Sequence, residues 1–142
     1  KLQPAIKINA SAELKEVGLE QLPSNLNEIA AQGRITLTAS NGEEIEIKAD
    51  NWSGFGKMFN KNVSYLLIDQ SRIAATALME QSDTYKISFY TDDNSKASVV
   101  IECKKAMSQK MTAEELKSLN QNADTSKQYT MYIGEVTKTL MR

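Results

Sequence analysis

The chain has 142 residues, of which 41% are hydrophobic and 25% are charged, and this length and composition fit one globular domain spanning 1–142. A formal net charge of −1, with lysines and arginines spread along the sequence, argues against nucleic-acid binding, and no apolar run approaches the roughly 20 residues of a membrane-spanning helix. The absence of histidine and the presence of a single cysteine exclude His-based catalytic triads, a structural zinc site and an intramolecular disulfide.

The N-terminal third predicts two short helices followed by a hairpin. We expect a helical segment over Ser11–Glu16 and an amphipathic helix over Asn25–Gln32, which Gly33 ends. From Arg34 onward apolar residues alternate with polar ones, and Asn41-Gly42 lies between two such runs. Because a type I′ turn needs positive φ at both central positions, Asn-Gly in this setting predicts two antiparallel strands joined by that turn.

The middle of the chain predicts a loop, a buried strand and a helix. The loop covers Trp52–Asn62 and contains two glycines, and the nearly continuous apolar run Val63–Ile68 predicts a strand buried on both faces. Ser71–Glu80 is the next predicted helix. Three of its apolar residues fall on one side, namely Ile73, Ala77 and Leu78.

The last third alternates with a period of two over three stretches. These stretches are Tyr85–Phe89, Ala97–Cys103 and Gln128–Leu140. Gly134 inside the last of them indicates a bulge or a close backbone contact. Roughly six strands with only short helices between them favour a mainly β, antiparallel, barrel-like sheet, because parallel strands need longer helical connections.

Two connections in this third have signals of their own. Asp92–Asn94 is a polar turn between strands. Thr112 with Glu115 matches a helix capping box, which predicts a short helix over Thr112–Leu119.

Two features are candidates for binding a phosphorylated planar cofactor. The glycine pair Gly54 and Gly56 lets backbone approach a flat ring, and Ser71 with Arg72 combines a hydroxyl, a helix start and a guanidinium for a phosphate. Each feature also has a purely structural interpretation. The glycines fit a tight turn between strands, and Asp69 could cap the helix and pair with Arg72.

Other single residues have the same two interpretations. Trp52 could border a ring, but a lone tryptophan is more often a core or interface anchor. Asn60 and Lys61 could donate to a planar cofactor or its phosphate, whereas a solvated loop lysine is the ordinary case. Cys103 lies in an alternating strand, which favours a small buried residue over a redox role.

Three blocks of sequence resemble the flavoredoxin branch of the flavin reductase-like, FMN-binding split-barrel family. Trp52-Ser-Gly-Phe-Gly through Asn60-Lys61 is similar to the Trp-Gly-Gly-x-Gly loop that ends in Trp-Asn-Lys-Pro. Ser71-Arg72 resembles the end of the Arg-Pro-Ser-Arg phosphate-binding stretch. The third block comprises Val99–Lys105 and Met131–Val136, which resemble strands near the family's C-terminus.

The resemblance implies an antiparallel split β-barrel with short helices, a homodimer, and FMN at the subunit interface. It also implies a function in flavin reduction or electron transfer, in which the flavin carries the redox chemistry. The cofactor-binding residues that we expect on this basis are Asn51, Trp52, Gly54, Asn60, Lys61, Ser71 and Arg72.

The sequence departs from the family pattern where the cofactor should bind. Asp69 stands at the position of the first phosphate-binding arginine, and the cofactor loop before the Glu-Cys-Lys-Lys strand is shortened to Asp92–Lys96. Since a carboxylate repels a phosphate, an equally open alternative is a flavin-free relative that acts as a binding or structural module. A smaller phosphorylated ligand, such as a pyridoxal phosphate-type compound, is a third hypothesis.

The compartment is not indicated by the sequence. The first residue is Lys1 rather than Met, which we expect to reflect removal of a leader or trimming of the chain. The composition fits a soluble protein, either cytoplasmic or exported.

Overall fold

A computed structural model describes residues 13–23, 26–91, 96–112, 114–116 and 128–142. Within these ranges the chain forms one eight-stranded sheet. The strands are β1 (Lys15–Val17), β2 (Arg34–Ala39), β3 (Glu44–Ile47), β4 (Trp52–Met58), β5 (Lys61–Asp69), β6 (Thr84–Tyr90), β7 (Val99–Thr112) and β8 (Gln128–Met141). The helices are α1 (Leu26–Gln32), α2 (Ile73–Gln81) and the 3-10 turns η1 (Leu19–Gln21) and η2 (Ala49–Asn51).

The strands are ordered β3-β2-β6-β7-β8-β5-β4, with β1 added to the end of β8, and every neighbouring pair is antiparallel. The predicted fold class, a mainly β antiparallel architecture with short helices, is therefore confirmed. The sheet is not closed, because β3 and β4 form its two ends.

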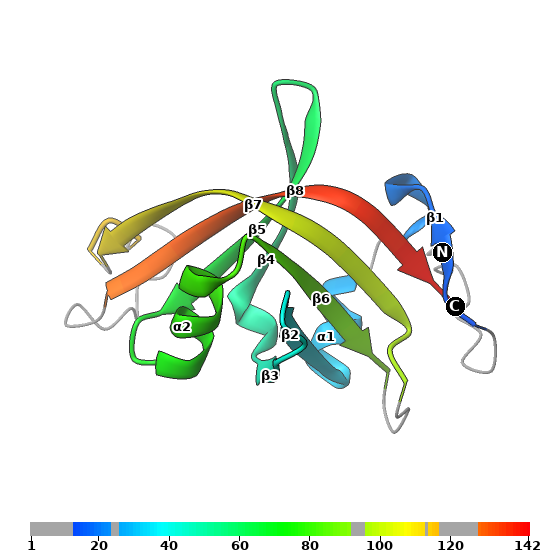
Figure 1. Ribbon diagram of the computed structural model, residues 1–142, viewed down its shortest axis with the longest axis horizontal. Coiled ribbons are helices and arrows are strands. Elements are labelled where there is room, and N and C mark those ends of the chain that lie inside the picture. The colour runs from blue at the N-terminus through cyan, green and yellow to red at the C-terminus, as the bar shows by residue number, and fades with distance from the viewer. Residues whose placement is uncertain (1–12, 24–25, 92–95, 113, 117–127) are drawn as a thin grey trace, which may run out of the picture.

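The two long strands β7 and β8 arch over the molecule, with α1 and α2 beneath them (Figure 1). The hairpin of β4 and β5 extends past β8 and rises on the opposite side from the helices (Figure 1). Alternation places one face of each strand in the core. The largest fully buried side chains there include Ile35, Leu37, Ile87, Phe89 and Tyr132.

Helix α2 packs with a different face from the one predicted. It buries Ala75, Leu78 and Met79, whereas Ile73 is 77% exposed. Of the residues predicted to share one side, only Leu78 is buried, because Ile73 and Ala77 are both exposed.

The β2–β3 hairpin is confirmed, but its turn is not type I′. Gly42 has a φ of 92°, while Asn41 is not among the residues with positive φ. The Gly42 N–H donates to Ala39 O at 2.9 Å and the Asn41 side chain accepts from the Glu43 N–H at 2.9 Å. A longer loop with glycine alone in the left-handed region replaces the two-residue turn.

The predicted loop over Trp52–Asn62 is wrong, since this stretch is a second hairpin. Met58 pairs with Lys61, so the turn contains only Phe59 and Asn60, whose φ values are 51° and 67°. Two positive φ values in a two-residue loop define the type I′ turn that we expected at Asn41-Gly42.

The first described residues form a strand rather than the predicted helix. Lys15 and Glu16, expected in a helix, belong to β1 and pair with Met141 and Leu140 of β8. This pairing supplies ladder hydrogen bonds that an isolated short helix would lack in water.

The capping box at Thr112 is confirmed, because the Glu115 N–H donates to Thr112 Oγ1 at 3.1 Å and the Thr112 N–H donates to Glu115 Oε1 at 2.8 Å. The predicted helix over Thr112–Leu119 is wrong in its described part, where Thr112 ends β7 and residues 114–116 form a turn. Its remainder and the polar turn Asp92–Asn94 lie outside the described residues.

Candidate functional site

The turn between β5 and α2 holds the predicted phosphate ligands. Asp69 Oδ1 accepts the Ser71 N–H at 2.8 Å, and Asp69 O accepts the Arg72 N–H at 2.9 Å. Asp69 thus closes a side-chain turn ahead of α2. It does not cap the helix as the structural interpretation predicted, because the N-cap residue is Arg72 and has no side-chain capping bond. The Ser71 side chain is exposed and Arg72 is half-buried.

The Arg72 guanidinium is fixed between two other elements. Its Nη2 donates to the backbone oxygen of Glu46 in β3 at 2.7 Å, and its Nη1 donates to Asn51 Oδ1 in η2 at 3.2 Å. One side chain thus joins the start of α2 to β3 and η2. Both of its terminal nitrogens are directed at protein oxygens.

Asn51 lies at the centre of this contact and is 8% exposed. Its Oδ1 also accepts the Lys48 N–H at 2.9 Å, and its Nδ2 donates to the Leu67 oxygen of β5 at 3.0 Å. The amide therefore bridges η2, β5 and α2. Two of the seven predicted cofactor-binding residues, Asn51 and Arg72, are brought together, and they bind each other.

Trp52 follows at the start of β4 and is a core residue with 6% exposure. Its Nε1 donates to Ser64 Oγ at 2.9 Å, and that hydroxyl donates to Gly54 O at 3.2 Å. The indole ring meets Phe55 and Phe89 edge to face, with centroids 5.3 Å and 5.0 Å apart. The interpretation of Trp52 as a core anchor is confirmed.

The β4–β5 hairpin requires glycine at positions 54 and 56 for structural reasons. Gly54 has a φ of 93° at the bulge between Trp52 and Phe55. A Cβ at Gly56 would lie 2.2 Å from the hydroxyl oxygen of Tyr65, so the tyrosine ring covers that position. The two glycines permit a bulge and a close side-chain contact, respectively.

Asn60 and Lys61 lie at the tip of the β4–β5 hairpin, away from Arg72. Lys61 Nζ is 3.6 Å from Glu135 Oε2, and both side chains are substantially exposed. The structure thus separates the predicted residues into the Asn51–Arg72 contact with Ser71 beside it, the Trp52–Gly54 region, and the hairpin tip.

An apolar pocket of about 260 Å³ adjoins Trp52. It is lined by Leu19, Leu22, Pro23, Leu26, Trp52, Gly54 and Phe55. A Cβ at Gly54 would meet nothing within 4 Å, so that side of the bulge is open. The pocket includes Gly54 of the predicted glycine pair, and its wall contains no charged side chain.

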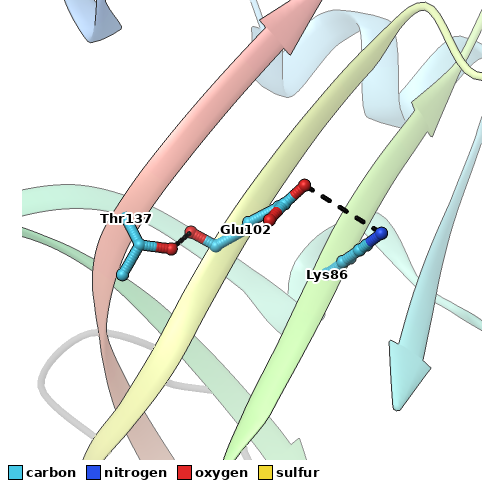
Figure 2. A network of polar contacts seen from close by, with 3 residues as sticks. All are labelled: Lys86, Glu102 and Thr137. Atoms are coloured by element: carbon cyan, nitrogen blue, oxygen red, sulfur yellow. Dashed lines mark hydrogen bonds and ion pairs between the residues drawn. The ribbon is translucent and has the colours of Figure 1, made fainter. Parts of the chain in front are cut away.

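A second, more polar pocket of about 350 Å³ was not predicted from the sequence. Its lining comprises Thr38, Ala39, Ser40, Gly42, Thr84, Tyr85, Lys86, Glu102, Cys103 and Thr137. Lys86 Nζ lies 3.9 Å from Glu102 Oε2, and Thr137 Oγ1 donates to the Glu102 backbone oxygen at 3.1 Å, so one network crosses β6, β7 and β8 (Figure 2). Only the strand register brings these residues together, and no local motif encodes it.

Cys103 in this region is buried and unsuited to nucleophilic chemistry. It is 2% exposed and pairs with Tyr85 across the β6–β7 ladder. Burial raises the pKa of the Cys103 thiol to about 12, and burial likewise raises the pKa of Tyr85. The thiol therefore remains protonated at neutral pH, in agreement with the predicted structural role.

The contacts at the helix start do not suit an FMN phosphate. The guanidinium is held by Asn51 and the Glu46 oxygen, and the Ser71 N–H is directed at the Asp69 carboxylate. A phosphate would have to displace these partners and approach a negative charge. Among the described residues there is also no group of three or more Cys, Asp or Glu side chains that could hold a metal ion.

No protein-family model matches the sequence, and no curated protein is similar to it. None of the described helices has the length and apolar character to cross a bilayer.

Three solved structures share part of the chain trace. The flavin reductase SMOB of the styrene monooxygenase from Pseudomonas putida S12 aligns over 76% of this chain and 78% of its own, with 11% identity and a TM-score of 0.46. The 2-nitrobenzoate 2-nitroreductase NbaA from Pseudomonas fluorescens aligns over 90% and 77%, with 11% identity and a TM-score of 0.47.

A putative oxidoreductase from Sinorhizobium meliloti 1021 aligns over 82% of this chain and 46% of its own, with 11% identity and a TM-score of 0.45. These are similarities of backbone trace alone. The flavoredoxin assignment and the cofactor-binding roles stay predictions.

Proposed function

We propose that this chain is a flavin-free, non-catalytic binding module built on a flavin reductase-like sheet. The observation that carries the proposal is the contact of Arg72 with Asn51 Oδ1 and Glu46 O. In this chain the arginine that the family resemblance assigns to phosphate has a structural role, because it links α2 to β3 and η2.

Two further contacts support the same interpretation. The Ser71 N–H donates to the Asp69 carboxylate and is therefore not available to a phosphate. The same carboxylate adds a negative charge at the helix start. The Trp52 indole N–H is bound inside the core by Ser64. Protein partners thus account for four of the predicted ligands, namely Asn51, Trp52, Ser71 and Arg72.

The test is a titration with FMN, followed by flavin fluorescence and by emission of the single tryptophan. We expect no saturable binding below about 100 µM, since the ionic part of the site is lacking. Riboflavin and pyridoxal phosphate titrated in parallel separate ring binding from phosphate binding. A micromolar dissociation constant for FMN would refute the flavin-free proposal.

FMN binding remains the second candidate because of one observation. The open face of Gly54 and the apolar wall around Trp52 offer a surface against which a flat ring could lie. If this candidate holds, Asp69→Arg increases FMN affinity, because it replaces a repulsive charge by an attractive one. On this second candidate the protein would act as a flavin reductase or a small electron carrier.

A further inference from the structure

Strand β7 has a long stretch of free edge. Its first part pairs with β6 up to Lys104, and one further contact follows on that side, from the Lys105 N–H to Asp83 O at 2.7 Å. From 106 to 112 the strand still pairs with β8, but no strand of the described residues pairs with its other side. Every second residue of 106–112 therefore directs its N–H and C=O away from the sheet.

This free edge is open to solvent. All residues from 106 to 110 are exposed, and Met107 is 45% exposed. In Figure 1 β6 leaves β7 near the middle of the arch, and the left part of β7 has only β8 beside it. Proteins usually shorten, bend or cover such an edge, whereas here a stretch of about 20 Å remains uncovered.

The two faces beside the edge differ in chemistry. Ser108 lies opposite Tyr132, which is fully buried, so Ser108 and Lys110 are on the core side of the sheet. Met107 and Met111 are on the outer face, where flexible methionine side chains can adapt to a partner. An extended segment beside β7 would meet methionine with one set of alternate side chains and lysine with the other.

The charge along the edge favours one kind of occupant. The segment 104–112 contains three lysines and no carboxylate. Lys105 Nζ donates to the Met79 oxygen of α2 at 2.6 Å, whereas Lys104 and Lys110 form no ion pair with any described residue. Pairing with an identical edge would bring like charges together, so a second copy is disfavoured and a segment with carboxylates is favoured.

We propose that the free edge of β7 binds an extended, acidic segment of another protein by β-strand addition. The main-chain groups of 106–112 form the ladder, apolar side chains of the partner contact Met107 and Met111, and its carboxylates face Lys110. Such a partner gives the proposed binding module its ligand class. The edge contains none of the residues expected to hold a cofactor, so flavin binding and peptide binding are tested separately.

The probe is a fluorescein-labelled, C-terminally amidated peptide of alternating valine and glutamate, long enough to cover 106–112. Fluorescence anisotropy, with the full chain as titrant, should give saturable binding with a dissociation constant between about 10 µM and about 1 mM. The same peptide with lysine in place of glutamate should bind at least about tenfold more weakly. A Val-Glu peptide methylated at every backbone nitrogen cannot donate to the ladder and should lose binding by a similar factor.

A charge reversal on the edge tests the orientation of the partner. Lys110→Glu should weaken binding of the Val-Glu peptide by about fivefold or more and strengthen binding of the Val-Lys peptide. Lys57→Glu is the matched control, because Lys57 is an exposed cation on β4 and its replacement changes the net charge equally. We expect it to leave both dissociation constants unchanged. Amide resonances of the ¹⁵N-labelled protein should shift at 104–112 and its partners on β8.

Four results would overturn the proposal. They are absence of saturable binding of the Val-Glu peptide up to about 1 mM protein, undiminished binding of the methylated peptide, equal effects of Lys110→Glu and Lys57→Glu, and amide shifts confined to other strands. Sedimentation equilibrium and amide exchange without peptide test the competing occupant. Protection of 106–112 that rises with protein concentration would assign the edge to a second copy and also reject the proposal. None of these results bears on the FMN titration, so the flavin-free proposal can stand when this one fails.

Discussion

The Arg72 guanidinium donates to Asn51 Oδ1 at 3.2 Å, and the same amide oxygen accepts the Lys48 N–H at 2.9 Å. These two residues, 21 positions apart, lock the start of α2 to the turn that precedes β4. Both residues were expected to bind the cofactor, but each forms a hydrogen bond with the other without any ligand. The stability of the fold should therefore depend on both.

The first prediction concerns this pair. Arg72→Met should lower the free energy of unfolding by about 1–3 kcal/mol, since it leaves Asn51 Oδ1 and the Glu46 oxygen with fewer donors. Urea unfolding measures the change. In a double-mutant cycle with Asn51→Ala, the two losses should be less than additive by about 0.5 kcal/mol or more.

Lys110→Met serves as the control for the first prediction, because Lys110 is an exposed cation on β7. Its replacement should change stability by less than about 0.5 kcal/mol. Strictly additive effects of Arg72→Met and Asn51→Ala would show that the two side chains do not support each other.

The second prediction concerns the buried hydrogen bond of Trp52. Ser64→Ala removes the acceptor of the indole N–H and should cost about 1–3 kcal/mol, because a buried donor is left without a partner. In a Trp52→Phe background the same change should cost less, since no donor remains. Chemical unfolding of the four proteins measures this difference, and an equal cost in both backgrounds would contradict the assignment.

The third prediction concerns the close contact of Gly134 with Tyr85. A Cβ at Gly134 would lie 2.1 Å from the Tyr85 hydroxyl oxygen, so Gly134→Ala should destabilise the fold by about 1–3 kcal/mol. Among the described residues that hydroxyl has no hydrogen-bond partner. Tyr85→Phe should therefore be nearly neutral alone and should recover part of the loss in the double variant. Thermal unfolding measures the stability of each variant. If the loss in the double variant equals the sum of the losses in the two single variants, the predicted contact is contradicted.

Much of the fold follows from alternation along the sequence. The period of two at Ile35 and Leu37, and again from Tyr85 to Phe89, correctly predicts strands with one face in the core. Local signals were less reliable for turns. Asn41-Gly42 has the composition of a type I′ turn, yet that turn forms at Phe59 and Asn60, where the pairing of β4 with β5 places Phe59 in a conformation that is unfavourable for it.

The candidate site was less predictable, because its contacts are made between distant segments. The sequence places Ser71 and Arg72 at a helix start but gives no indication that Asn51 will reach the guanidinium. A glycine pair is equally compatible with a ligand and with a bulge. The contact of Gly56 with the Tyr65 ring depends on the pairing of β4 with β5, which the sequence did not predict. The exposed Phe59 also lay in a stretch that composition alone assigned to a loop.

The last prediction concerns Cys103, whose pKa is raised to about 12 by burial, with the nearby Glu102 charge acting in the same direction. In the unfolded chain the thiol titrates near 9.0, so the native state binds more protons between these two values. The stability contributed by Cys103 is therefore complete below about pH 9 and is lost as pH rises toward 12, with a maximal slope of about 1.4 kcal/mol per pH unit.

The free energy of unfolding, measured with urea between pH 8 and pH 11, should fall less steeply with pH for Cys103→Ala than for the wild type. This difference in slope does not depend on how much stability the lost side chain costs at pH 8. A thiol reagent at pH 8 should react slowly with the native protein and rapidly in urea, and rapid reaction with the native state would contradict the burial of this thiol.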